Sequence, residues 1–180
     1  NGKDVHEPFH RQDFFFINYA WKNSYKALSY ASENLITISE GDCYISQPYG
    51  GYALRCDSRD RSVVFGVLIK KDVFFREFLS LVYADTALFN FFIAPRENKF
   101  SEGSIYLSCG QDHAMRTILE LMVIEYAHKR GDTQRMLKTL FTSLFLQIAR
   151  LHRQESKNMA HDPICERMME YIEAHSDTVS

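Results

Sequence analysis

The sequence has little of what marks several classes of protein. Its 180 residues hold 21 Lys and Arg against 23 Asp and Glu, so there is no excess of positive charge. Because phosphate recognition normally needs clustered basic residues, we expect this segment alone not to bind nucleic acid. No apolar run approaches the roughly 20 residues that cross a bilayer, so the sequence predicts no membrane-spanning helix.

Cysteine is sparse and unpaired in the sequence. The four cysteines include no C-x-x-C pair, and they are Cys43, Cys56, Cys109 and Cys165. This spacing is typical neither of a zinc site nor of a disulfide framework, and it predicts reduced cysteines in a cytoplasmic protein. The chain begins at Asn1 without a charged region followed by an apolar one, so we expect a segment of a soluble protein without a signal peptide.

Common catalytic motifs are missing as well. The sequence has no G-x-S-x-G, no glycine-rich phosphate loop and no H-E-x-x-H. Cys109 and His113 stand four residues apart, but they join the end of a predicted strand to the first turn of a predicted helix. That is not the arrangement of a nucleophile and its base, so we expect a protein that is not an enzyme.

What the first part of the chain does carry is a series of short strand-like runs. They cover residues 13–21, 33–39, 41–47, 52–55, 62–70 and 104–109. Turn residues separate them, as in Ser39-Glu40-Gly41-Asp42, and such spacing indicates an antiparallel sandwich or barrel. A helix is predicted over 73–82, and the apolar loop 84–103 is expected to cover the barrel.

The second part has the apolar periodicity of helices. One is predicted over 112–129 and another from Asp132 or Thr133 to about 155, and the short connection at Gly131 makes them an antiparallel hairpin. The second helix has a heptad-like seam, made of Leu137, Phe141, Leu144, Ile148 and Leu151. This seam is interpreted as the dimer interface, with burial inside a single chain as the alternative.

The end of the chain predicts one more helix. Residues 157–161 are polar and typical of a linker, and Asp162-Pro163 is a common helix start. The predicted fold is therefore α+β. It has an antiparallel β-barrel in residues 1–110, a helical hairpin for dimerisation in 111–156, and a linker with a terminal helix in 157–180.

Two stretches carry a resemblance to a known family. The matching residues are His10, Asp13 and Phe14 for an H-x-H-D-F-x-E pattern, and Gly41, Asp42 and Pro48 for a G-D-x-x-x-x-x-P pattern. With a barrel followed by a hairpin, residues 8–155 resemble the N-terminal cupin domain of AraC-type transcription regulators. The terminal helix resembles the first helix of the helix-turn-helix domain that follows in this family; an ordinary amphipathic helix is the alternative.

The departures from the family pattern concern the metal site. Metal-binding cupins use three histidines and one glutamate, and the resemblance puts Gln12, Phe16 and Tyr52 at three of these four positions. His10 alone remains, and a single histidine does not hold a transition metal. We therefore expect no metal and no cofactor. The alternative, a metal-dependent cupin isomerase or dioxygenase, needs that metal.

The resemblance also predicts which side chains face the barrel interior. Side chains alternate along a strand, so the expected ligand pocket consists of Gln12, Phe14, Phe16, Asn18 and Tyr52. Its aromatic, amide and phenol groups suit a small organic ligand, although a solid core with those groups bonded to the backbone is equally compatible. The outward set, expected beneath the hairpin, is Phe15, Ile17, Tyr19 and Trp21.

The function that the resemblance implies is effector sensing and dimerisation in a cytoplasmic DNA-binding transcriptional regulator. The expected partners are a second copy of the chain, a small-molecule effector, and DNA bound through a C-terminal domain that lies mostly outside this chain. A constitutive dimerisation module without an effector is a further alternative.

Overall fold

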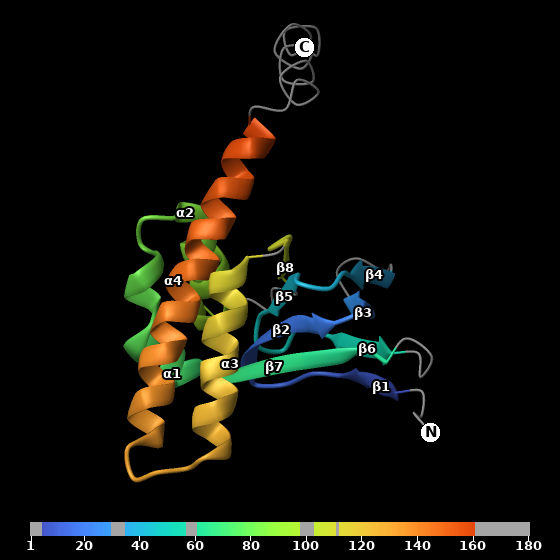
Figure 1. The fold of residues 1–180 in the computed structure, drawn as a ribbon. Coiled ribbons are helices and arrows are strands. Elements are labelled where there is room, and N and C mark those ends of the chain that lie inside the picture. The colour runs from blue at the N-terminus through green and yellow to red at the C-terminus, as the bar shows by residue number, and fades with distance from the viewer. Residues whose placement is uncertain (1–4, 30–34, 57–60, 98–102, 111, 161–180) are drawn as a thin grey trace, which may run out of the picture.

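A computed structural model shows two antiparallel sheets that face each other, with a helical hairpin packed on one of them (Figure 1). It describes residues 5–29, 35–56, 61–97, 103–110 and 112–160. The terminal helix expected in residues 162–180 lies outside this range, as does the end of the predicted linker at His161. None of the described helices is both long and apolar enough to span a bilayer.

Each sheet has four strands. The first has the order β1–β6–β3–β4, with bounds Val5–His10 (β1), Tyr52–Cys56 (β6), Tyr25–Ser29 (β3) and Leu35–Ile38 (β4). The second has the order β7–β2–β5–β8, with bounds Val63–Lys70 (β7), Phe14–Lys22 (β2), Cys43–Ser46 (β5) and Ser104–Leu107 (β8). All neighbouring strands are antiparallel. The antiparallel β content is as predicted, and the described strands form two sheets without being shown to close into a barrel.

Strand β2 explains why the second sheet is covered on both faces. It pairs with β5 on one side and β7 on the other, and its side chains alternate between two hydrophobic clusters. Phe15, Ile17 and Tyr19 belong to the cluster beneath the helices, while Phe16 and Ala20 belong to the cluster between the sheets. The predicted division of this strand into two apolar faces is confirmed.

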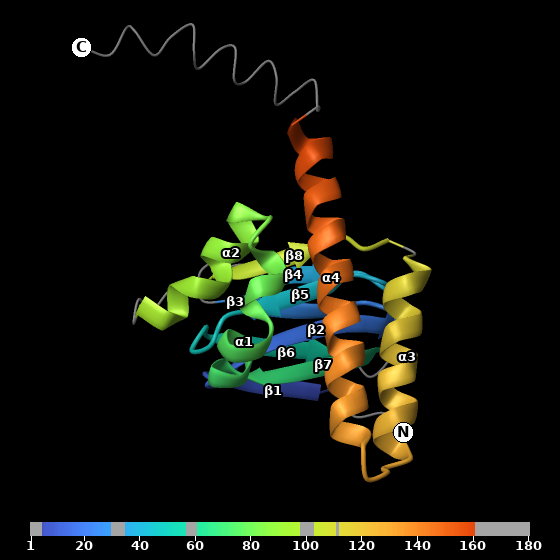
Figure 2. The same ribbon diagram turned by 90° about the vertical axis from the view of Figure 1, so that its left-hand side faces the viewer.

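The helices lie outside the second sheet (Figure 2). They comprise α1 (Lys71–Glu77), a 3₁₀ turn at Leu79–Val82, α2 (Thr86–Ile93), a 3₁₀ turn at Ala94–Glu97, α3 (His113–Ala127) and α4 (Thr133–Ala160). Asp112 caps α3 by accepting a hydrogen bond of 2.7 Å from the Met115 amide, and its other oxygen accepts one of 2.9 Å from Gln147 of α4. This carboxylate therefore ties the two arms of the hairpin together.

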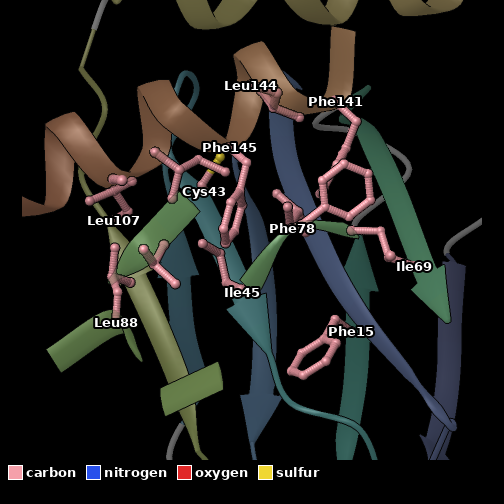
Figure 3. Packing of buried hydrophobic residues seen from close by; sticks show 14 of the residues in the cluster. Phe15, Cys43, Ile45, Ile69, Phe78, Leu88, Leu107, Phe141, Leu144 and Phe145 are labelled. Atoms are coloured by element: carbon pink, nitrogen blue, oxygen red, sulfur yellow. The ribbon is translucent and has the colours of Figure 1, made fainter. Parts of the chain in front are cut away.

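An aromatic core joins the hairpin to the sheet. Phe145 of α4 points toward the sheet (Figure 3), with its ring centroid 5.1 Å from that of Phe74 and 5.0 Å from that of Phe92. Phe78 and Phe141 make a further edge-to-face pair at 4.6 Å. Such aromatic pairs stabilise beyond the area they bury, so α1, α2 and α4 form one packed layer.

The expected dimer seam lies in this core. Phe141, Leu144 and Ile148 are at most 5% exposed in the single chain, and Leu137 and Leu151 pack against the same cluster. The outer face of the second sheet is itself apolar, so it supplies the surface that a second copy was expected to provide. Phe141, Leu144 and Ile148 are therefore covered within the chain, as the intramolecular alternative has it, whereas Leu137 and Leu151 are only partly buried; the dimer interface stays a prediction.

Other differences concern element boundaries. Strands β1 and β3 were not predicted, and the apolar loop over 84–103 contains α2, which Asp85 caps through a 3.0 Å hydrogen bond from the Leu88 amide. Helix α4 continues to Ala160, so residues 157–160 extend the helix and are not a linker. They continue a helix beyond Leu151, the last residue of its predicted apolar seam, so apolar periodicity gives no signal there.

Candidate ligand site between the two sheets

The space between the sheets is occupied by aromatic side chains from four strands. The buried members of this inter-sheet cluster are Phe16, Ala20, Tyr25, Ala27, Ile38, Tyr44 and Tyr52. Phe16 and Tyr52 face each other with ring centroids 4.6 Å apart, and Tyr44 stacks on Tyr52 at 5.5 Å. The members of the cluster are aromatic and aliphatic, so their own hydrogen-bonding capacity comes from the tyrosine hydroxyls, with the amide of Asn18 beside them.

Asn18 supplies that amide. Its Nδ2 donates a hydrogen bond of 2.9 Å to the Tyr52 hydroxyl, which joins the two sheets through a polar contact. Asn18 lies opposite Gly66 in the pairing of β2 with β7. A β-carbon on Gly66 would come within 3.0 Å of Asn18 Oδ1, so the missing side chain at Gly66 leaves the Asn18 amide room at the sheet edge.

Tyr25 brings an unsatisfied polar atom into the cluster. Its hydroxyl is buried beside that of Tyr52, which is near enough to raise its pKa, but within the part of the chain that the structure describes it has no hydrogen-bond partner in good geometry. Burial, followed by the nearby Tyr52, raises the pKa of the Tyr25 hydroxyl far above its usual value, so it stays a neutral donor. A buried hydroxyl without a partner costs about 1–3 kcal/mol, and a bound molecule with an acceptor would remove that cost.

The structure brings together three of the five predicted pocket residues. Phe16, Asn18 and Tyr52 are in contact or hydrogen-bonded as described above, whereas Gln12 lies in the bend between β1 and β2. Phe14 is partly exposed at the start of β2, outside the buried cluster. The prediction from the resemblance treated residues 10–18 as one continuous strand, but no strand covers residues 11–13, and this break interrupts the alternation at Gln12.

Two members of the cluster were not predicted. Tyr44 lies directly opposite Asn18 in the β2–β5 pairing, and pairing the two predicted strands in this register would have found it. Tyr25 lies on β3, where Tyr25, Lys26 and Ala27 alternate between buried and exposed positions. That alternation was a signal, but it covers too few residues to mark a strand alone.

Of the four cupin ligand positions, the three at Gln12, Phe16 and Tyr52 hold no side chain that commonly binds a metal. Nowhere in the described ranges do three or more His, Cys, Asp or Glu side chains lie close enough to hold a metal ion. Phe16 and Tyr52, which stand at two of the family's ligand positions, pack ring against ring. Their side chains therefore form a wall of the inter-sheet cluster.

The Gly41-Asp42 pair of the family pattern has a structural role instead. Asp42 is buried, and its Oδ1 accepts hydrogen bonds from the amides of Cys109 and Gly110 at 3.1 and 3.3 Å. Its Oδ2 accepts one of 2.5 Å from the Tyr106 hydroxyl. Gly41 has a φ of 90°, and a β-carbon there would lie 2.2 Å from the Gly110 carbonyl oxygen. The pair thus fixes the segment between β8 and α3.

The hydrogen bond to Asp42 also affects the titration of Tyr106. Burial and this bond raise the pKa of the Tyr106 hydroxyl to about 12. The hydroxyl therefore remains a donor to Asp42 throughout the neutral pH range.

Comparison with known proteins gives a match in structure only. No protein-family model matches the chain, and no curated protein sequence matches it. Among solved structures, an apo form of ToxT from Vibrio cholerae strain SCE256 superposes with a TM-score of 0.54 at 14% identity, covering 83% of this chain and 52% of that one.

A second structure of ToxT, from Vibrio cholerae O395, was solved with (E)-4-(8-methylnaphthalen-1-yl)but-3-enoic acid bound. It superposes with a TM-score of 0.51 at 12% identity, covering 83% of this chain and 53% of that one. The chain therefore spans about half the length of the proteins it matches. At these identities the likeness establishes a fold shared with about half of ToxT.

Proposed function

We propose that this chain is the effector-sensing domain of an AraC-type transcriptional regulator of the cytoplasm and is not an enzyme. Two independent lines support the proposal: the Gly41-Asp42 and Pro48 pattern of the sequence, and the fold shared with ToxT, a regulator of the AraC family. DNA would be bound by a further C-terminal domain, in keeping with a chain that covers about half of ToxT.

The main support for a ligand site here is the Tyr25 hydroxyl, which lies beside the hydrogen-bonded Asn18–Tyr52 pair and has no well-formed hydrogen bond among the described residues. The side chains of the inter-sheet cluster are aromatic and aliphatic. They favour a neutral ligand that has a planar apolar part and an acceptor for the Tyr25 hydroxyl. Such a ligand would regulate only to the extent that it binds one arrangement of the sheets and helices better than another. The link between the sheets through Asn18 and Tyr52 is the contact it would alter.

A thermal-shift screen tests this site. We expect a neutral aromatic metabolite to raise the melting temperature by several degrees, because a ligand present at a hundred times its Kd adds about 2.7 kcal/mol to the free energy of unfolding. Sugars and short acids serve as the comparison panel. Asn18→Leu should abolish the shift while leaving a cooperative melting transition, because it removes the amide from the site without adding bulk.

Tyr83→Phe is the control for this screen, because Tyr83 is an exposed tyrosine that packs against Phe89 of α2 and is not a member of the inter-sheet cluster. The control should keep the full shift. If no compound in a broad panel stabilises the protein, or if Asn18→Leu is stabilised equally, the effector site between the sheets is rejected in favour of a filled core.

Dimerisation belongs to the same proposal but needs another surface. The outer side of α3 exposes Leu121 and Ile124, which are 46% and 55% accessible. Clustered exposed apolar side chains on a helix mark an interaction site more often than isolated ones do. We place the contact with a second copy on this side of the hairpin, in place of the buried residues of α4.

Ile124→Lys tests that contact. In analytical ultracentrifugation the wild-type protein should sediment as a dimer and the variant as a folded monomer, because a lysine in the centre of an apolar interface loses its hydration. Leu35→Lys, on the exposed side of β4, should leave the dimer intact. A dimer that survives Ile124→Lys with unchanged affinity would remove α3 from the interface.

A further inference from the structure

A groove opens on the side of the molecule where β7 meets the base of the hairpin. Its volume is about 740 Å³, and α1, α3 and α4 contribute to its walls. Five consecutive residues of β7, Phe65 to Ile69, line it. Because successive side chains of a strand point to opposite faces, a groove lined by all five runs along the edge of the strand and not along one of its faces.

That edge carries no strand in the described part of the chain. β7 is the terminal strand of its sheet and pairs only with β2. The backbone groups on its far side are therefore free to pair with another strand, and natural sheets usually cover such an edge or place charges on it. Lys70, at the end of β7, is its only charged residue. The edge is thus an open template of eight residues.

The hairpin limits the size of a segment that can lie beside the free edge of β7. Its closed end projects past β7 in both views (Figures 1 and 2), so it overhangs the position of the next strand. A second copy joined antiparallel through β7, about a two-fold axis perpendicular to the sheet, would bring its own hairpin to the same side of the continuous sheet, where the two hairpins would collide. A single extended segment has no such layer of helices and fits under the overhang.

The walls set the side-chain pattern of that segment. On the helix side of the groove, Val67 and Phe141 form an apolar floor, and Val123 forms an apolar wall. At the rim, Glu77 contacts Lys138 Nζ at 2.5 Å and Arg76 Nε at 3.2 Å. Two cations thus share one carboxylate. The rim keeps a net positive charge, and among the described residues the Arg76 guanidinium is bonded only through Nε, which favours a carboxylate on the incoming segment.

We propose that this groove binds an extended peptide segment of a partner protein, which pairs antiparallel or parallel with β7 as a fifth strand of the sheet. The segment has apolar side chains at alternate positions facing Val67 and Val123, and an acidic residue near Arg76 and Lys138. Main-chain hydrogen bonds to β7 supply affinity, and the alternating pockets supply specificity. About five residues of the partner fill the site, at roughly 3.3 Å per residue.

The experiment is a selection of random octapeptides displayed on phage, carried out on the wild-type protein with counter-selection on Val123→Arg. Val123 is 42% exposed, so this variant keeps its fold. We expect enriched peptides with apolar residues at every second position and at least one Asp or Glu. The best peptide, labelled with fluorescein, should bind Val123→Arg at least tenfold more weakly and Lys138→Glu several-fold more weakly in fluorescence anisotropy.

Leu146→Arg is the matched control, because Leu146 is 45% exposed on the same hairpin and does not line the groove; its affinity should be unchanged. Methylation of the peptide backbone nitrogens should abolish binding, and hydrogen exchange should slow at residues 65–69. The proposal is overturned if no peptide is enriched over the counter-selection, if the enriched peptides have helical spacing, or if backbone methylation has no effect. Asn18→Leu should leave peptide binding intact, which separates this site from the proposed effector site.

Discussion

Replacing Leu144 with lysine is expected to unfold the protein and not to yield a folded monomer. Leu144 is completely buried in the layer between α4 and the second sheet. Loss of a buried leucine alone costs about 2–5 kcal/mol, and the desolvated ammonium group adds several more. Because small domains are stable by only about 5–15 kcal/mol, circular dichroism in the absence of urea should already show loss of tertiary structure.

The neighbouring Leu146 provides the control. It is 45% exposed on the same helix, so Leu146→Lys should change the free energy of unfolding by less than about 0.5 kcal/mol. The two leucines are two positions apart in the sequence and lie on opposite sides of α4, one buried and the other exposed. A folded Leu144→Lys monomer of near wild-type stability would contradict the packing described above and would return Leu144 to a surface between subunits.

The fold could be predicted as far as local patterns determine it. Strands such as β2 and β7 are long runs of aromatic and aliphatic residues that end at turn residues, and α3 and α4 have long apolar faces on either side of Gly131. These features require only the periodicity of side chains along each element. The two faces of β2 followed from the same alternation, and the structure confirms them.

The surface against which each helix packs could not be predicted in the same way. A heptad-like seam on α4 has one pattern whether a second helix or the chain's own sheet covers it, so the seam from Leu137 to Leu151 did not reveal its partner. Helix α2 is apolar on most sides, and Leu88 and Phe92 enter the core while Phe89 and Phe91 are only partly covered. With little contrast between its faces, its sequence did not show a helical period.

The candidate site shows the same limit at the level of single residues. Phe16, Asn18 and Tyr52 were placed together from the family's spacing, but the role of Tyr25 depends on β3 pairing with β6, a contact distant in sequence. The Gly41-Asp42 pattern was found, and its physical role was not. Only the folded chain brings Asp42 to the backbone amides of Cys109 and Gly110, which lie more than sixty residues away.

Asp42→Ala is expected to lower the free energy of unfolding by about 3–5 kcal/mol. The carboxylate accepts from two backbone amides and from the Tyr106 hydroxyl, and alanine would leave these donors without an acceptor in a buried place. Because each hydrogen bond to a charged group contributes about 1.5–3 kcal/mol, the loss should be visible as a large fall in the midpoint of urea unfolding.

Two further variants separate the backbone contacts from the tyrosine contact. Asp42→Asn keeps an oxygen for the amides of Cys109 and Gly110, so it should lose less stability than Asp42→Ala. Tyr106→Phe removes one bond from a partly exposed side chain and should cost about 1 kcal/mol or less. If Asp42→Ala were no more destabilising than Tyr106→Phe, the amides would not depend on this carboxylate. The Gly41-Asp42 pair would then need an explanation other than anchoring the segment before α3.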